Sequence, residues 1–307
     1  MKNHDCKDDD ATLLVLDGQN AKILAIGTDG LILGTILENC GGTPDGIAID
    51  KANRHIYWTN MGDHYDQNDG SIERIDFEGS NRTVIIPKGE TFTPKQLKLD
   101  LVNRHLYWCD REGMRVMRSS FDGTGILTLI MTGNSQADRQ DETNHCVGVT
   151  LDAKRGHIYW TQKGPSKGGK GRIFRAGLIS PEGETPESRS DIELLWENLP
   201  EPIDLDLNED SGELYWTDRG APPNGNSVNR ANIATPFKEP EILTTGLDEA
   251  IGMALDIEND RVFFSDLGGD LYCRKLSGTT SCLLFRGDGR FTGIAYLDQR
   301  LIIKKIN

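Results

Sequence analysis

The sequence has little that would place the chain in a membrane or on nucleic acid. It contains no run of about 18 apolar residues, the length needed to cross a bilayer as a helix. Its 34 Lys and Arg residues are outnumbered by 48 Asp and Glu residues, and the formal net charge is −14. Phosphate binding needs a basic stripe. The composition therefore argues against both a membrane span and a nucleic-acid partner.

Cysteine is scarce, with six residues in 307. Cys6, Cys40, Cys109 and Cys146 are scattered without the spacing of a metal site, so we expect no bound metal. Cys273 and Cys282 flank a predicted hairpin turn, where a cross-strand disulfide or two thiols would both fit. The rarity of disulfides in cytosolic proteins favours two thiols.

The first ten residues, MKNHDCKDDD, lack the apolar stretch of a secretory signal. As the sequence stands, this predicts a cytoplasmic protein, and a secreted one if a signal has been removed.

The dominant feature of the sequence is an internal repeat of about 50 residues. A signature strand reads HIYWTN at 55–60, HLYWCD at 105–110, HIYWTQ at 157–162, ELYWTD at 213–218 and RVFFSD at 261–266. LLVLD at 13–17 is a degenerate sixth copy. Repeats of this period indicate an array of supersecondary units that stack on one another.

Each copy contains four predicted strands. An alternating strand such as GIAID at 46–50 precedes the signature, and a strand with a central arginine follows it. Those arginines are Arg74, Arg118, Arg175, Arg230 and Arg274. A fourth strand, such as RTVII at 82–86, completes a unit with the pattern of a propeller blade.

The repeated residues have predicted structural roles. Tyr and Trp at adjacent positions should pack against the blades on either side, since neighbouring side chains of a strand point to opposite faces. The Thr and Asp that follow should bond to the backbone of the next turn. The repeated arginine should pair with an acid of a neighbouring blade.

The chain ends predict a closed ring. FTGIAYLD at 291–298 is another first strand with no full blade after it, and the N-terminal segment supplies the missing strands. We therefore predict an all-β protein, a six-bladed β-propeller spanning 12–307, whose last blade is closed by both termini. Residues 1–11 should form a flexible tail.

These motifs resemble the YWTD, or class B, repeat of the low-density lipoprotein receptor family over roughly residues 12–300. The signature strands in register, the arginine strands and the Gly-Asp turns carry the resemblance. It implies a six-bladed propeller that could bind a protein on one face, as the receptor propellers do. In the receptors such propellers sit beside cysteine-rich modules, and no such module is present in this sequence.

In architecture and length the sequence is also similar to the fungal hetero-Diels–Alderases of tropolone–sesquiterpene biosynthesis. Those enzymes join a reactive quinone methide to a cyclic terpene olefin. The resemblance implies a cofactor-free cyclisation of a hydrophobic small-molecule substrate in secondary-metabolite biosynthesis.

One face of a propeller collects the loops between blades and the loops between second and third strands, and a site is expected there over the axis. Four of these loops are long and unlike their repeat mates: 60–70, 131–146, 162–171 and 218–227. Unequal loops on one face favour a shaped pocket.

Candidate catalytic residues are two axial acids and the two loop histidines outside the repeat, namely Asp45, Asp204, His64 and His145. Asp204 stands where three other blades have glycine. Candidate substrate-binding residues are Lys163 and Arg219, which could polarise a carbonyl oxygen, and Met61, Tyr65 and Phe291, which could provide apolar lining.

Two alternatives remain open at this point. A protein- or ligand-binding module would use the same face for a protein partner. A metal-dependent, lactonase-like hydrolase would need several axial acid and Asn ligands, and Asp45 and Asp204 alone fall short of that set.

Overall fold

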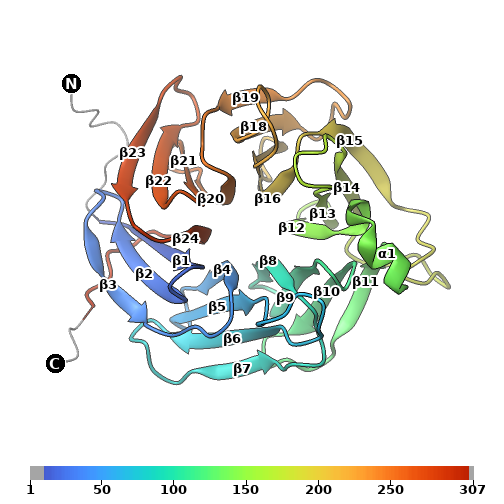
Figure 1. The fold of residues 1–307 in the computed structure, drawn as a ribbon, viewed down its shortest axis with the longest axis horizontal. Coiled ribbons are helices and arrows are strands. Elements are labelled where there is room, and N and C mark those ends of the chain that lie inside the picture. The colour runs from blue at the N-terminus through green and yellow to red at the C-terminus, as the bar shows by residue number, and fades with distance from the viewer. Residues whose placement is uncertain (1–9, 304–307) are drawn as a thin grey trace.

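The computed structural model describes residues 10–303, which form six four-stranded antiparallel sheets arranged as blades around one axis (Figure 1). The first strand of each blade lies nearest the centre of the ring (Figure 1). The predicted all-β, six-bladed β-propeller is confirmed. We name the blades A to F in chain order.

The strands of each blade are given from the axis outward. Blade A contains β24 (Phe291–Leu297), β1 (Thr12–Asp17), β2 (Lys22–Gly27) and β3 (Ile32–Leu37). Blade B contains β4 (Pro44–Asp50), β5 (His55–Asn60), β6 (Ser71–Asp76) and β7 (Thr83–Ile86). Blade C contains β8 (Pro94–Asp100), β9 (His105–Asp110), β10 (Arg115–Ser120) and β11 (Leu127–Met131). Blade D contains β12 (Cys146–Asp152), β13 (His157–Gln162), β14 (Gly171–Gly177) and β15 (Glu193–Leu199). Blade E contains β16 (Pro202–Asn208), β17 (Glu213–Asp218), β18 (Ser227–Asn232) and β19 (Glu241–Thr244). Blade F contains β20 (Ala250–Asp256), β21 (Arg261–Asp266), β22 (Asp270–Lys275) and β23 (Ser281–Arg286). The helical turns α1 (Gln136–Gln140) and η2 (Glu142–Asn144) lie between β11 and β12.

Blade A is closed by both ends of the chain, as predicted. β24 pairs antiparallel with β1, with Thr12 opposite Leu297. Of the expected tail, residues 1–9 lie outside the described residues. Ala11 is buried, and its carbonyl accepts the Thr28 N–H at 3.3 Å.

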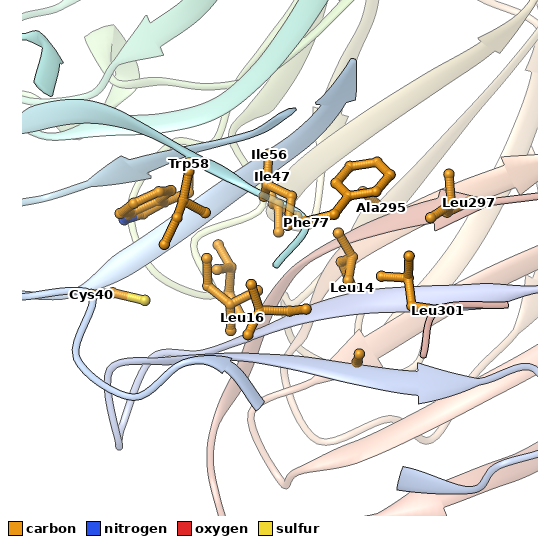
Figure 2. Packing of buried hydrophobic residues seen from close by; sticks show 14 residues of the cluster. Leu14, Leu16, Cys40, Ile47, Ile56, Trp58, Phe77, Ala295, Leu297 and Leu301 are labelled. Atoms are coloured by element: carbon orange, nitrogen blue, oxygen red, sulfur yellow. The ribbon is translucent and has the colours of Figure 1, made fainter. Parts of the chain in front are cut away.

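The Tyr-Trp pair of each signature strand packs to both sides, as predicted. Tyr107 of blade C shares a core cluster with Trp160 of blade D, and Tyr159 of blade D shares one with Trp216 of blade E. At the closing junction Trp58 packs in one cluster with Leu14 and Leu16 of blade A (Figure 2). The hydrophobic core is therefore a series of layers between blades.

The hydroxyl at the Thr position of the signature ties each blade to the next. Thr161 Oγ1 accepts the Gly148 N–H at 2.7 Å and donates to the carbonyl oxygen of Ile203, in the following blade, at 2.8 Å. Thr59, Thr217 and Ser265 make the same two bonds in their blades. The prediction that this hydroxyl bonds to the following turn is wrong. A register shift in the first strand, between Cys146 and Val149 in blade D, directs the Gly148 N–H to the hydroxyl instead.

The acid after this Thr does cap backbone, as predicted. Asp218 Oδ1 accepts the Gly220 N–H of the following turn at 2.8 Å.

The repeated arginines differ from prediction in two ways. Arg175 and Arg230 pair with Glu193 and Glu241, which lie on the fourth strand of the same blade, not on a neighbouring blade. The cause is register, because each acid stands directly opposite its arginine. Arg274 is one position out of the repeat: it opposes Val262, and Cys273 takes the arginine place opposite Phe263. Cys273 is also the register partner of Cys282.

The inter-blade hydroxyl link predicts a stability effect. Thr161→Val should lower the free energy of unfolding by about 1–3 kcal/mol, because the buried Gly148 N–H and Ile203 carbonyl would lose their partner. Thr161→Ser, which keeps the hydroxyl, is the matched control. Urea unfolding measures both, and equal midpoints for Val and Ser would contradict the role of the hydroxyl.

Candidate functional site

The axial end of the loop face is closed by buried side chains at the start of the first strands. Asp45 of β4 forms an ion pair with Lys95 of β8, and its Oδ1 accepts a hydrogen bond from Gln96 Nε2 at 3.1 Å. All three side chains are buried. Burial lowers the pKa of Lys95 to about 8, against the opposing effect of Asp45.

Across the axis from this polar group lies an apolar one. Val147, Ile203 and Ile251, at the equivalent position of β12, β16 and β20, are buried and pack together. We call the residues Asp45, Lys95, Gln96, Val147, Ile203 and Ile251 the plug, which is polar on one side of the axis and apolar on the other.

Three of the predicted binding residues are structurally equivalent. Met61, Lys163 and Arg219 each follow the last residue of a signature strand, and each donates its N–H to the connection that leads into its own blade. Arg111 of blade C has the same place. Sequence reasoning missed it, although it follows HLYWCD directly.

The cations of this ring are held by acids. Lys163 Nζ lies 2.5 Å from Glu142 Oε2, and Arg219 lies 2.7 Å from Glu201 Oε1. Arg111 Nε lies 2.7 Å from Glu112 Oε1. Lys163 is also buried. Lys163 and Arg219, which were predicted to bind a substrate oxygen, therefore donate to Glu142 and Glu201 instead. Met61 is buried as well.

The long connection 131–146 is fixed to the loop face. α1 begins with a capping box formed by Ser135 and Asp138. His145 at the end of this segment is buried, its Nε2 lies 2.9 Å from the Arg139 carbonyl oxygen, and its Nδ1 has no hydrogen-bond partner. Burial lowers the pKa of His145, so the ring is neutral at neutral pH.

The remaining candidates, His64, Tyr65 and Phe291, differ in exposure. His64 is exposed, and Tyr65 is exposed with the Arg111 guanidinium 5.0 Å from its ring centroid. Phe291 is buried in the core between blades A and F, where it stacks on Phe285. Whether these residues act together in one site stays a prediction.

A cavity of about 230 Å³ opens at the other end of the axis, where the first strands end. We call this end the turn face, because it carries the turns between first and second strands. Most of the lining residues are apolar, among them Ile47, Leu99, Met253, Leu255, Ile294 and Tyr296, but polar groups make up more than half of the surface that the cavity exposes. The turns on this face expose Leu101, Val102 and Ile257, of which Val102 is 89% exposed. The same turns carry the exposed Lys51 and Lys154, so the approach to the cavity is both apolar and charged.

Two charged side chains lie among these lining residues. Lys98 Nζ of β8 lies 3.1 Å from Asp206 Oδ1 of β16, and the side chains are 25% and 22% exposed. Burial opposes the charge of Lys98, but Asp206 and Asp204 outweigh it, so the pKa of Lys98 is raised. Asp206 also accepts the Thr150 hydroxyl at 3.4 Å. The pair remains accessible to a ligand.

Asp204 lies behind this pair, toward the plug. It is buried, and its two oxygens accept the N–H groups of Leu205 at 2.9 Å and Met253 at 3.0 Å. Burial raises the pKa of Asp204 to about 7, against the opposing effect of Lys98. Asp204 is thus the one predicted catalytic residue that adjoins the cavity charges.

Lys98, Thr150 and Asp206 were missed at the sequence level, but the repeat contains the signal. They occupy the position that is Ala48, Ala254 and Ala295 in blades B, F and A. A small residue at this level lets the axis stay open, and three polar replacements in six copies mark a departure from the repeat.

Residues 10–303 contain no group of three or more His, Cys, Asp or Glu side chains placed to hold a metal ion. Within the same range, no helix has the length and apolar character to cross a membrane.

Comparison with known proteins places the chain among fungal propellers. No family model matches the sequence. Low-density lipoprotein receptor-related protein 1 of Pyricularia oryzae is 44% identical over 289 residues, which cover 90% of this chain and 92% of that protein. The 3-hydroxyacyl-CoA dehydrogenase-like protein LAM1 of Cochliobolus heterostrophus is 39% identical over 290 residues, and the match spans 61% of its length.

Solved structures show the same fold at low identity. The structure titled as a nidogen/laminin complex matches 94% of the chain with a TM-score of 0.73 at 21% identity. TolB from Acinetobacter baumannii matches 94% with a TM-score of 0.66 at 14% identity. Since the fungal relative is 44% identical over nearly the whole of both proteins, the chain belongs to the family of low-density lipoprotein receptor-related protein 1 of Pyricularia oryzae, as a six-bladed propeller with YWTD-type repeats.

Proposed function

We propose that the chain is a small-molecule enzyme that binds a hydrophobic, carbonyl-bearing substrate in the axial cavity of the turn face. The observation that carries this proposal is an axial cavity of about 230 Å³ whose lining residues are mostly apolar and include one accessible Lys–Asp pair. An apolar site with a few placed polar groups is typical of small-molecule binding. The exposed Leu101 and Val102 beside the opening suit a hydrophobic ligand.

The proposed reaction is a cofactor-free hetero-Diels–Alder cyclisation. A hydroxybenzyl alcohol loses water to give a quinone methide, which adds to the double bond of a cyclic terpene with formation of one C–O and one C–C bond. No oxidant or reductant is needed. Holding both reactants in a reactive orientation can contribute roughly 7–11 kcal/mol when the geometry is ideal.

The cavity charges have separate roles in this proposal. Lys98 Nζ donates to the substrate oxygen and stabilises the charge that develops there. Asp206 accepts the phenolic proton and passes it to the benzylic hydroxyl, which leaves as water, since its carboxylate lines the same wall. Asp204 does not contact the substrate in this proposal, and its negative charge raises the pKa of Lys98. On this proposal the loop-face candidates Asp45, His145, Lys163 and Arg219 hold the closed end of the ring.

The names of the similar proteins suggest different functions. The LAM1 name refers to a dehydrogenase-like protein, whereas the described blades are antiparallel and contain no parallel βαβ unit of the Rossmann type that binds dinucleotides. The nidogen title names a complex with laminin. A protein-binding module is therefore the second candidate, favoured by the exposed apolar turns at 101–102 and 257.

Loss of the cavity amine should abolish most of the activity. Lys98→Met should slow product formation from a hydroxybenzyl alcohol and a cyclic terpene olefin by about 100-fold, the usual effect of removing a charge-stabilising donor. Chiral chromatography of the cycloadduct gives the rate. Lys154→Met, in an exposed turn on the same face, is the control and should react like wild type. Equal rates for both variants would contradict the proposal, and no adduct even with wild type would favour the binding module.

Asp204 should make stability depend on pH. Its pKa is about 7 in the fold and near 3.8 when unfolded, so the folded state binds more protons between these values and stability falls as pH rises from about 4 to about 7. Asp218, also raised to about 7 by burial, adds to this slope. Asp204→Asn should make the slope shallower. Urea midpoints at pH 5 and pH 7.5 measure it, and an unchanged difference would show that Asp204 does not titrate in this range.

A further inference from the structure

A larger cavity, of about 610 Å³, lies at the rim of the loop face between blades A and B. It is bounded by the connection from β3 to β4, by the start of β6 and by β7. Its lining includes Gly41, Glu73, Arg82, Val84 and Pro87. We call it the A/B groove. Its volume is within the range of small-molecule sites.

The floor of the A/B groove holds a carboxylate that the repeat does not require. Glu73 stands opposite Trp58 in register, and the same place is taken by Met117, Phe174, Asn229 and Tyr272 in blades C to F. The Glu73 side chain is only 7% exposed. Burying a carboxylate is costly unless it is paired, so its presence needs a reason.

The pairing of Glu73 leaves one oxygen nearly unused. Oε2 accepts Arg82 Nε at 2.6 Å, and Arg82 is fixed by the carbonyl oxygens of Asn39 at 2.6 Å and Cys40 at 2.8 Å. Oε1 has only the Ser71 hydroxyl at 3.5 Å, the limit of a hydrogen bond. An acceptor with spare capacity therefore lines the groove.

The wall of the groove also departs from the repeat. Blade C has Thr91 and Phe92 where blade B has Gly41 and Gly42, as the bonds from Arg111 N–H to Thr93 O and from Met61 N–H to Thr43 O align the two connections. The Thr91 hydroxyl lies 3.2 Å from Trp108 Nε1, whereas the buried Trp58 Nε1 has no partner. Trp58 lies in one cluster with Cys40, next to Gly41 (Figure 2). The Asn60 side chain fills the space at Gly42, where an added Cβ would lie 2.2 Å from Asn60 Oδ1, whereas at Gly41 the nearest atom to an added Cβ is Asn60 Nδ2 at 3.4 Å.

We propose that the A/B groove is a second binding site, for a neutral amphipathic small molecule with an N–H or O–H donor. The donor bonds to Glu73 Oε1, and the apolar part lies on Val84, which is 56% exposed, and on Pro87. A neutral ligand fits because the lining carries two acids, Asp63 and Glu73, and two bases, Arg82 and Lys88. This site is separate from the axial cavity and does not depend on the proposed cyclisation.

The test uses 4-fluorobenzamide as the probe, with 4-fluoro-N,N-dimethylbenzamide as the matched compound without an N–H donor. Fluorine NMR titration of the full chain measures both affinities. The primary amide should bind at least about tenfold more tightly, because a hydrogen bond to a charged acceptor is lost in the dimethyl compound.

Two variants locate the binding. Glu73→Met, which installs the residue of blade C, should weaken binding of the primary amide at least about tenfold, while Asn229→Met, at the same place in blade E, should not change it. Should Glu73→Met fail to fold, Val84→Arg at the exposed edge should block the groove with the fold intact. Equal affinity for the two amides, or binding unaffected by Glu73→Met or Val84→Arg, would overturn the proposal. Lys98→Met should leave this binding unchanged, which separates the two sites.

Discussion

The structure depends on one small hydrogen-bonded bridge, repeated around the ring. In blades B, D, E and F, a hydroxyl near the end of the signature strand accepts an N–H from its own first strand and donates to the first strand of the next blade. Where blade C has Cys109, the thiol still reaches the Gly148 carbonyl at 3.2 Å. At the closing junction Thr292 takes over and donates to the Pro44 carbonyl at 3.0 Å. Because the bridges are short and buried, they fix how closely neighbouring first strands approach at the axis.

That spacing decides what the axis can contain. At Gly148 an added Cβ would lie 2.0 Å from the Ile203 carbonyl oxygen, and the equivalent glycines Gly46, Gly252 and Gly293 are similarly close to the next blade. At this level of the axis only blades C and E carry side chains, those of Gln96 and Asp204. Two residues further along the first strand, toward the turn face, blades A, B and F carry alanine, whereas blades C, D and E carry Lys98, Thr150 and Asp206. The rigid ring thus separates a plug on the loop face from a chemically distinct cavity on the turn face.

The sequence predicted the ring, whereas the predicted site residues remain untested and the proposed axial site was not among them. Blade number, closure by both ends and the packing of Tyr and Trp follow from period and alternation, which are local properties of the repeat. The role of the Thr hydroxyl and the partners of Arg175 and Arg230 depend on a register shift and on strand pairing, which no single repeat reveals. The long loops directed the prediction to His64 and Lys163, but Lys163 is buried in an ion pair with Glu142. Comparing the middle residue of each first strand would have identified Lys98 and Asp206.

On the proposed function, the substrate binds in the axial cavity of the turn face and not on the loop face. A crystal structure of the protein soaked with 2-hydroxybenzyl alcohol distinguishes the two faces. We expect density for the ring between Leu99, Met253 and Tyr296, with a substrate oxygen within hydrogen-bond distance of Lys98 Nζ. Density above the plug, against Lys163 or Arg219 on the loop face, with the axial cavity empty, would contradict it.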